Sequence, residues 1–295
     1  MRVRDGVVAV REAALDTVLG GAVREVLNAG PVEDSPIRFL ALAANLRQAI
    51  QQVKATAIDE SGRRVDYAGL VTNPAFAVYR GLTPALRELN PAHIITRHER
   101  LAFWLNLYNG LVIDAVITYG IRQRVTEGRF GAFGFFRRAA YNIGGVRFSC
   151  DDIEHGILRG NRGRQFLPGP QFGTLDPRGA WIIDPPDARV HFALNCGSRS
   201  CPPISTYDAD RIDGQLTLAT RSGLNLEAAL DAQRGALWLP EVFRRFAGDF
   251  GGRRGVIAFL LHYLPDDERR SWLEARGSRA RFRNHRYDWR LNVLD

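Results

Sequence analysis

The segment from residue 97 to residue 119 restricts the fold more than any other part of this 295-residue chain. Its apolar residues lie on nearly every side of a helix, so the helix has no face that suits water. Thr96 and Glu99 have the spacing of a capping box, which predicts where the helix begins. We therefore expect a buried central helix that other elements cover on all sides.

Two asparagines, Asn106 and Asn109, interrupt the apolar surface of this helix. They are three residues apart, so their amides project from neighbouring positions on one face. A buried amide that lacks hydrogen-bond partners costs a few kcal/mol, so both amides need partners. Two alternatives stay open: the amides bond to neighbouring backbone and only fix the helix, or they face a functional site.

Shorter elements are predicted before and after the central helix. Helical spacing is present at residues 13–28, 37–53, 65–89, 151–160, 211–226, 241–250, 256–264 and 267–276. A loop rich in glycine and phenylalanine is predicted at residues 128–136. A hairpin is predicted at residues 141–148, and two paired strands are predicted at residues 181–183 and 189–194.

Helices around a small antiparallel sheet give an α+β fold, with the central buried helix packed on that sheet. No low-complexity tract or clear linker follows residue 65. We expect an N-terminal helical extension over residues 1–64 and one α+β domain over residues 65–295.

Residues 191–203, which we call the cysteine segment, hold two of the three cysteines and one of the six histidines. An apolar run leads into a small polar turn, which is typical of a strand that delivers a thiol to a loop. A catalytic thiol must be partly ionised by an imidazole or by backbone N–H groups. We therefore expect Cys196 as the nucleophile and His191 as its base or orienter, with Cys201 as the second candidate.

Further candidates surround these residues. His155, beside Glu154, is the alternative base. The turn that begins at Asn195 could aim successive N–H groups at a developing oxyanion. Arg199 could lower a thiol pKa or bind a carboxylate. Asn106 and Asn109 complete the set of supporting residues.

Four stretches resemble signature motifs of the domain-of-unknown-function 547 family: residues 101–109, 151–160, 191–203 and 287–292. The resemblance covers residues 65–292, and the family has no settled activity to carry over. The arrangement is similar, more loosely, to papain/transglutaminase-like cysteine enzymes, in which a central helix packs on an antiparallel sheet. Those enzymes usually carry the thiol at the start of the central helix, where this chain has no cysteine. The resemblance therefore implies a thiol supplied by the cysteine segment.

The composition bears on the partner and on the cellular compartment. The formal charge is +8 and the pI is near 9.9, but the basic residues are scattered arginines with Lys54 as the single lysine. Scattered charge argues against a nucleic-acid partner, which usually meets charge gathered on one face. The densest cluster, at residues 276–289, is interpreted as a solvated arm whose aromatic residues pack on the domain. Three cysteines are too few for a disulfide scaffold, which favours the reducing cytoplasm.

The start of the chain lacks the pattern of a signal peptide, and no run of about 18 apolar residues predicts a membrane span. We expect a thiol-dependent hydrolase or acyl/amide transferase that acts on a small molecule or peptide without a cofactor. Three alternatives stay open: a redox pair of Cys196 and Cys201, a zinc site that adds His191 or His155 to these thiols, and a non-catalytic binding module with an arginine-rich surface. The substrate bond and the oligomeric state are open at this point.

Overall fold

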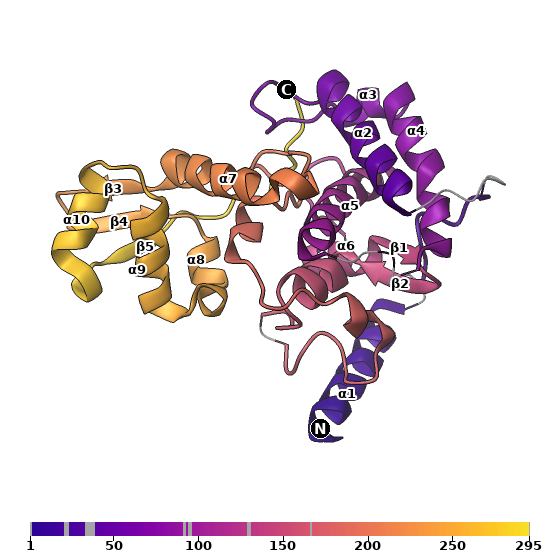
Figure 1. Cartoon of the computed structure of the whole chain (residues 1–295), viewed down its shortest axis with the longest axis horizontal. Coiled ribbons are helices and arrows are strands. Elements are labelled where there is room, and N and C mark those ends of the chain that lie inside the picture. Colours follow the sequence, from indigo (N-terminus) through magenta and orange to yellow (C-terminus); the bar gives the residue numbers. More distant parts are fainter. Residues whose placement is uncertain are drawn as a thin grey trace.

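Helix α5, Arg97–Thr118, lies at the centre of the fold (Figure 1). The computed structural model describes residues 2–20, 24–32, 39–90, 93, 96–128, 131–165 and 167–294. Every residue of α5 from Leu101 to Val116 is buried. The Thr96 hydroxyl accepts the Glu99 N–H at 3.2 Å, and the Glu99 carboxylate accepts the Thr96 N–H at 2.8 Å. The predicted capping box and the predicted buried central helix are both confirmed.

Among the described helices, α5 alone has the length and apolar composition that crossing a membrane requires. Within its most apolar window, 89% of the residues are buried inside the protein, as in the core helix of a folded domain.

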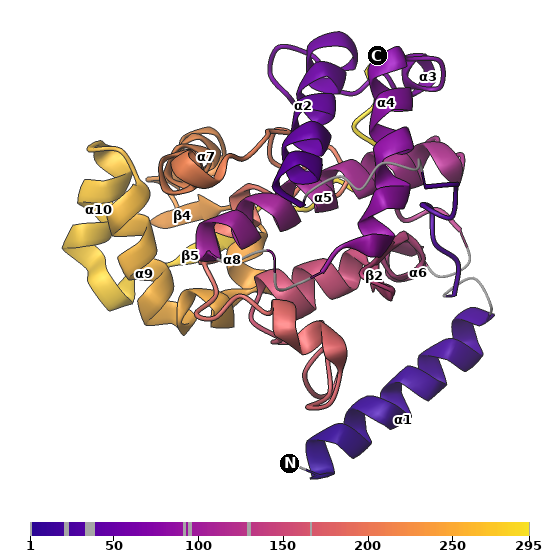
Figure 2. The same ribbon diagram turned by 45° about the vertical axis from the view of Figure 1, so that its right-hand side comes forward.

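The elements that cover α5 form what we call the main core. Helices α2 (Phe39–Ala57), α3 (Tyr67–Leu70) and α4 (Pro74–Leu82) lie on one side of α5, and the short helix η2 (Thr83–Glu88) follows them (Figures 1 and 2). The helical region predicted at residues 65–89 thus consists of three short helices. The N-terminal segment takes part in this core, because Leu46, Ile50 and Val53 of α2 are buried in it. The division at residue 64 stays a prediction.

A hairpin of β1 (Ala140–Ile143) and β2 (Val146–Ser149) lies against α5, and its strands are antiparallel. The Trp104 ring of α5 lies 5.0 Å from the Phe148 ring of β2. The Tyr141 hydroxyl of β1 donates to the buried Asp114 carboxylate of α5 at 2.8 Å. The predicted hairpin and the α+β class are therefore confirmed.

A second core lies at the other end of the molecule (Figures 1 and 2). It is built by α7 (Ile212–Glu227), β3 (Ala229–Asp231), β4 (Ala236–Leu239), α8 (Val242–Arg245), η8 (Ala247–Phe250), α9 (Gly252–Tyr263), α10 (Glu268–Arg276) and β5 (Phe282–Asn284). Strand β4 pairs antiparallel with β3 and parallel with β5. Phe250 joins this core through the rings of Phe243 and Phe259, at 4.7 and 4.9 Å. After β5 the chain returns to the main core, where Val293 pairs with Val65.

The two strands predicted at residues 181–183 and 189–194 are wrong. The first stretch begins at the last residue of the short 3₁₀ helix η5, Pro177–Trp181, and continues without regular structure. Most of the second stretch belongs to the 3₁₀ helix η6, Ala188–Phe192. At the start of η6, the Asp187 carboxylate accepts the backbone N–H two residues further on at 2.9 Å, which caps the turn. This local hydrogen bond offers the backbone an alternative to a strand, although the apolar run suits either structure.

Two other predictions differ from the structure. The first helix, α1, covers Arg2–Leu19, while the prediction was residues 13–28. Gly20 has a left-handed backbone with φ of +67°, which ends the helix although apolar spacing continues beyond it. The loop predicted at residues 128–136 contains the helix α6, Gly131–Arg138, while residues 129 and 130 lie outside the described residues.

We expect Gly110→Ala to destabilise the protein by about 1–3 kcal/mol, because the added methyl group would overlap the buried ring of Tyr79. Gly81→Ala on the neighbouring helix α4 is the matched control, because the space around Gly81 is open. That control should stabilise the helix by about 0.5–1 kcal/mol. Urea unfolding of both variants measures the difference, and equal stabilities would contradict the packing of α5 described here.

Candidate active site

Asn109 of α5 fixes the turn of the cysteine segment. Its Nδ2 donates to the carbonyl of Ala193 at 3.1 Å, and its Oδ1 accepts the N–H of Asn195 at 2.9 Å. Asn195 extends the turn, because its Oδ1 accepts the Gly197 N–H at 2.8 Å and its Nδ2 donates to the Pro202 carbonyl at 2.6 Å. The two amides therefore hold the backbone on both sides of Cys196.

Asn106 makes the equivalent connection to a different segment. Its Nδ2 donates to the Tyr207 carbonyl and its Oδ1 accepts the Tyr207 N–H, both at 2.8 Å. Both asparagines of α5 thus bind backbone groups of segments that pack on the helix. These hydrogen bonds agree with the alternative in which the amides bond to backbone groups. Asn109 does not line the cleft but holds the backbone of the cysteine segment, which does.

Four side chains, which we call the thiol cluster, meet beyond this turn: Cys196, Ser198, Cys201 and Tyr287. The Tyr287 hydroxyl lies 3.0 Å from the Cys196 sulfur and 3.2 Å from the Cys201 sulfur. The Ser198 hydroxyl also contacts both sulfurs, at 3.4 and 3.3 Å. The backbone N–H of Cys196 donates to the Cys201 sulfur at 2.9 Å. Several donors therefore surround the Cys201 sulfur.

The two thiols differ in acidity because the Cys201 sulfur accepts a hydrogen bond that Cys196 donates. Burial raises the pKa of the Cys201 thiol, but hydrogen bonds from Cys196, Ser198 and Tyr287 outweigh burial and bring this pKa to about 7. Burial raises the pKa of the Cys196 thiol well above its usual value, and the hydrogen bond to Cys201 adds to the effect. The backbone N–H of Cys196 donates to the Cys201 sulfur alone, which favours Cys201 as the thiol that carries the first negative charge of the coupled pair.

His191 is oriented by a carboxylate that sequence reasoning missed. Its Nε2 lies 2.9 Å from Oδ2 of Asp249, and its ring stacks on Phe246 with centroids 4.3 Å apart. Burial alone would raise the pKa of the Asp249 carboxyl, but hydrogen bonds from His191 and Arg159 outweigh it and hold that pKa well below its usual range. The ionised carboxylate accepts the Nε2 proton, so Nδ1 of a neutral His191 imidazole is a proton acceptor.

The helix predicted at residues 151–160 is a π-helix, η4, Asp152–Leu158. Its hydrogen bonds join residues five apart, as from the Arg159 N–H to the Glu154 carbonyl at 3.0 Å. Gly160 ends it with φ of +64°. Single turns of π-helix are rare and frequently lie at functional sites.

Glu154 and His155 project from η4. The Tyr108 hydroxyl donates to the Glu154 carboxylate at 3.1 Å. Nη1 of Arg159 lies 2.9 Å from Nδ1 of His155, and a guanidinium only donates, so Nδ1 must be the acceptor. Burial lowers the pKa of the His155 imidazole, which favours the neutral ring with its proton on Nε2. His155 is therefore an N–H donor, and its Nε2 lies 3.8 Å from Oδ1 of Asp151.

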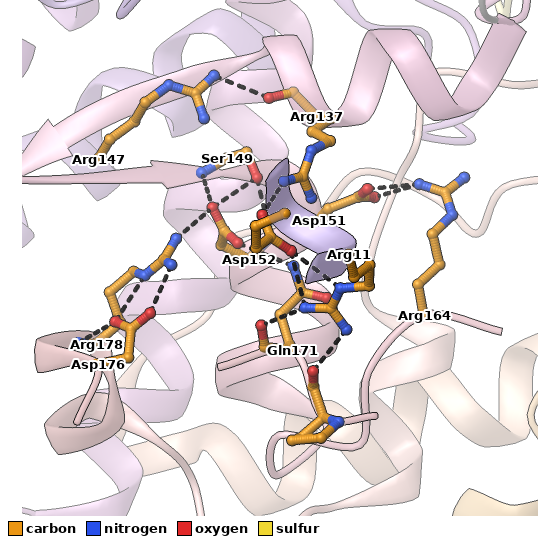
Figure 3. A network of polar contacts seen from close by, with 12 residues as sticks. Arg11, Arg137, Arg147, Ser149, Asp151, Asp152, Arg164, Gln171, Asp176 and Arg178 are labelled. Carbon is orange, nitrogen blue, oxygen red and sulfur yellow. Dashed lines mark hydrogen bonds and ion pairs between the residues drawn. The ribbon is translucent and has the colours of Figure 1, made fainter. Parts of the chain in front are cut away.

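A network of polar contacts anchors η4 to the surrounding chain (Figure 3). The Asp152 carboxylate accepts the Ser149 N–H at 2.9 Å and the Gln171 amide at 2.9 Å, and it pairs with Arg178 at 3.0 Å. Arg11 of α1 reaches the same region and donates to the Gln171 carbonyl at 2.8 Å. These contacts fix the backbone that presents Glu154 and His155.

One cleft brings the candidate residues of η4 and of the cysteine segment together. It is lined by all four residues predicted as catalytic and by the second thiol: Glu154, His155, His191, Cys196 and Cys201. Asn106, Asn109, Asn195 and Arg199 are not among its lining residues. The backbone N–H of Arg199 donates to the Arg290 carbonyl at 2.9 Å, which connects the cysteine segment to the C-terminal residues.

Within the cleft, the imidazoles and the thiols are not hydrogen-bonded to each other in the described part of the chain. The Cys196 sulfur contacts Ser198 and Tyr287 and not His191, so the expected role of His191 as base or orienter stays a prediction. The imidazoles and the sulfurs line one cleft, and a substrate could occupy the space between them.

Sequence reasoning missed three residues of this site: Tyr108, Asp249 and Tyr287. Tyr287 and Asp249 lie 86 and 58 residues from the side chains that they contact in the cysteine segment, Cys201 and His191. Tyr287 is the first residue of the motif at residues 287–292 that resembles the family signature, and this position was the sequence signal for its role. Neither Asp249 nor Tyr108 has a spacing pattern that sets it apart.

No cluster of three or more His, Cys, Asp or Glu side chains with metal-binding geometry occurs among the described residues. The zinc alternative therefore has no ligand set in that part of the chain.

Comparison with known proteins gives a family and no activity. Residues 93–222 match the family model described as protein of unknown function, DUF547. The match covers α5, η4, the cysteine segment and most of α7, whereas Asp249 and Tyr287 lie beyond it. No curated protein and no solved structure matches the chain. No named relative supports the looser similarity to papain/transglutaminase-like enzymes.

Asn109→Ala should destabilise the protein by about 1–3 kcal/mol and loosen the cysteine segment, because a backbone carbonyl and an N–H lose their partner. Asn106→Ala is the matched control, because it removes two equivalent bonds from the same helix. Amide hydrogen exchange measures the local effect: Asn195 should exchange faster in Asn109→Ala, and Tyr207 should exchange faster in Asn106→Ala. The same exchange pattern in both variants would refute a specific role of Asn109.

Proposed function

We propose that the chain is a thiol-dependent hydrolase or acyl/amide transferase of the cytoplasm that acts on a small molecule or a peptide. One observation carries the proposal: two hydrogen-bonded thiols and an imidazole oriented by a carboxylate line the same cleft. A nucleophile with a lowered pKa, a base and a group that orients the base are the parts that covalent acyl transfer requires.

The thiol pKa values favour Cys201 as the nucleophile. A thiolate is the reactive form of cysteine, and Cys201 is the thiol whose pKa is about 7. Cys196, Ser198 and Tyr287 donate hydrogen bonds that stabilise this charge. In this proposal Cys201 is the nucleophile in place of Cys196, and Cys196 is its neighbouring donor at the more exposed position.

In this proposal His191 is the base, and Asp249 orients it. The Cys201 thiol passes its proton to Nδ1 of His191, and its sulfur bonds to the carbonyl carbon of the substrate. The bond between that carbon and the leaving group breaks, and the leaving group departs with the proton from Nδ1. Nδ1 of His191 then takes a proton from water, which attacks the thioester and releases the acid and the thiol. Asp249 keeps the proton of the neutral ring on Nε2, so that Nδ1 remains the acceptor. The Nε2–H of His155 is a further donor in the cleft.

A redox dithiol is the second candidate, because one tyrosine hydroxyl and one serine hydroxyl contact both sulfurs. Oxidation to a Cys196–Cys201 disulfide would transfer two electrons to an oxidant and release two protons. Mild oxidation followed by peptide mass spectrometry distinguishes the candidates. A rapid and reversible loss of two hydrogens on this pair would favour the redox role.

An activated ester that needs no specific recognition tests the acyl-transfer proposal. With p-nitrophenyl acetate, we expect a burst of about one equivalent of nitrophenolate and an acetyl group on Cys201, as detected by peptide mass spectrometry. His191→Ala should slow the release of this acetyl group by about 10²–10⁴-fold, the usual contribution of a general base.

Two serine variants serve as controls for this experiment. Cys201→Ser should abolish the burst, whereas Cys150→Ser should preserve it, because Cys150 is buried in the main core and burial raises its thiol pKa well above the usual value. Acetylation of neither Cys196 nor Cys201 would refute the proposal, as would a release rate that His191→Ala leaves unchanged.

A further inference from the structure

A broad surface groove opens beside the thiol cleft, and the two share Glu241, Arg245, Tyr287 and Trp289 as lining residues. We call it the arginine groove, because five arginines and only two acidic residues line it. A ligand that lies in this groove can therefore reach the thiol cluster past Tyr287, whose hydroxyl contacts both sulfurs.

Both acidic residues of the arginine groove are already neutralised. The Glu241 carboxylate pairs with Arg244, and the Asp288 carboxylate pairs with Arg290 at 2.5 Å. The other three arginines of the groove are Arg124, Arg245 and Arg286. None of these three guanidinium groups has a carboxylate partner among the described residues.

Other arginines near the cleft are paired. Arg159 binds Asp249, Arg164 binds Asp151 and Arg178 binds Asp152, each at 3.0 Å or less. Three guanidinium groups that lack a counter-charge, all lining one groove, create a positive potential that attracts anions. The positive charge of the chain as a whole is scattered, so this local excess at the entrance of the cleft is a distinct feature.

The half-buried Arg245 of α8 has the best-defined position among the three. Its guanidinium lies 5.2 Å from the centroid of the Trp289 ring and 5.9 Å from that of Tyr287. Cation–π contacts of this kind involve the face of the guanidinium and leave its N–H edge available to a planar anion. Because Tyr287 also contacts the sulfurs, Arg245 would hold an anionic group next to the reacting thiol.

We infer that the substrate carries a carboxylate or phosphate group, which Arg245 binds together with Arg124 and Arg286 while the reacting carbonyl meets Cys201. This inference rests on the thiol chemistry proposed above and adds the substrate class to it. A guanidinium binds either oxyanion through two parallel N–H···O bonds.

Two alkylating probes of similar size test the inference without a known substrate: iodoacetate, which is an anion, and iodoacetamide, which is neutral. In both reactions the thiolate attacks the methylene carbon and iodide leaves. The ratio of the iodoacetate rate to the iodoacetamide rate on the pair is measured at low salt and compared with the ratio for free cysteine. We expect the protein to raise this ratio by about ten-fold, the lower end of electrostatic steering into a charged site.

Arg245→Gln should return the ratio most of the way to the value for free cysteine, and the double variant Arg124→Gln, Arg286→Gln should lower it as well. Arg276→Gln is the matched control, because it removes the same charge from an exposed arginine that stacks on Trp272, at 4.5 Å, outside the arginine groove. Replacing sodium chloride with sodium acetate or sodium phosphate at equal ionic strength identifies the preferred oxyanion, as the one that slows iodoacetate selectively.

A wild-type ratio equal to that of free cysteine would overturn the inference, and so would equal effects of Arg245→Gln and Arg276→Gln. Either result leaves the proposed function standing, because the iodoacetamide rate reports on the thiols by themselves. An inert pair of thiols would instead refute the proposed function.

Discussion

Burying α5 on every side is the constraint from which the rest of the structure follows. A helix of 22 residues that is buried from Leu101 to Val116 requires neighbours all around it, and the main core supplies them from both ends of the chain. The polar side chains of α5 then become attachment points. Asn106 binds the backbone at Tyr207, Asn109 binds the cysteine segment, and Tyr108 binds Glu154. The candidate site is therefore built against the buried central helix of the fold.

The proposed chemistry of the site depends on how one negative charge is shared between the half-buried Cys196 thiol and the buried Cys201 thiol. The hydroxyls of Ser198 and Tyr287 contact both sulfurs, but the backbone N–H of Cys196 points only to Cys201. This asymmetry favours Cys201 as the thiol that ionises first. His191 lines the same cleft and is oriented by Asp249, so it can act on a substrate or a water without a direct bond to either sulfur.

Local patterns predicted the elements whose causes are local. The capping box at Thr96, the apolar surface of α5 and the hairpin at residues 141–148 are encoded within a few residues, and the structure contains all three. The strands predicted at residues 181–183 and 189–194 are wrong. In the second stretch, Asp187 caps a 3₁₀ helix in an apolar run that also suits a strand. The sequence also could not predict which of the two thiols is more acidic, because Tyr287 lies 86 residues from Cys201. Long-range contacts of this kind leave no spacing pattern in the sequence.

A pH titration of the thiolate absorbance tests the central claim most directly, in a Cys150→Ser background that leaves only the pair. The account predicts that one thiol ionises at a pH of about 7 and that Cys201→Ser removes this transition. Tyr287→Phe should raise the midpoint by about one pH unit, because a hydrogen bond to a charged group contributes about 1.5–3 kcal/mol. Tyr263→Phe in α9 serves as the control and should leave the midpoint unchanged. Ionisation of both thiols only above a pH of about 8.5, as for ordinary cysteines, would contradict the account.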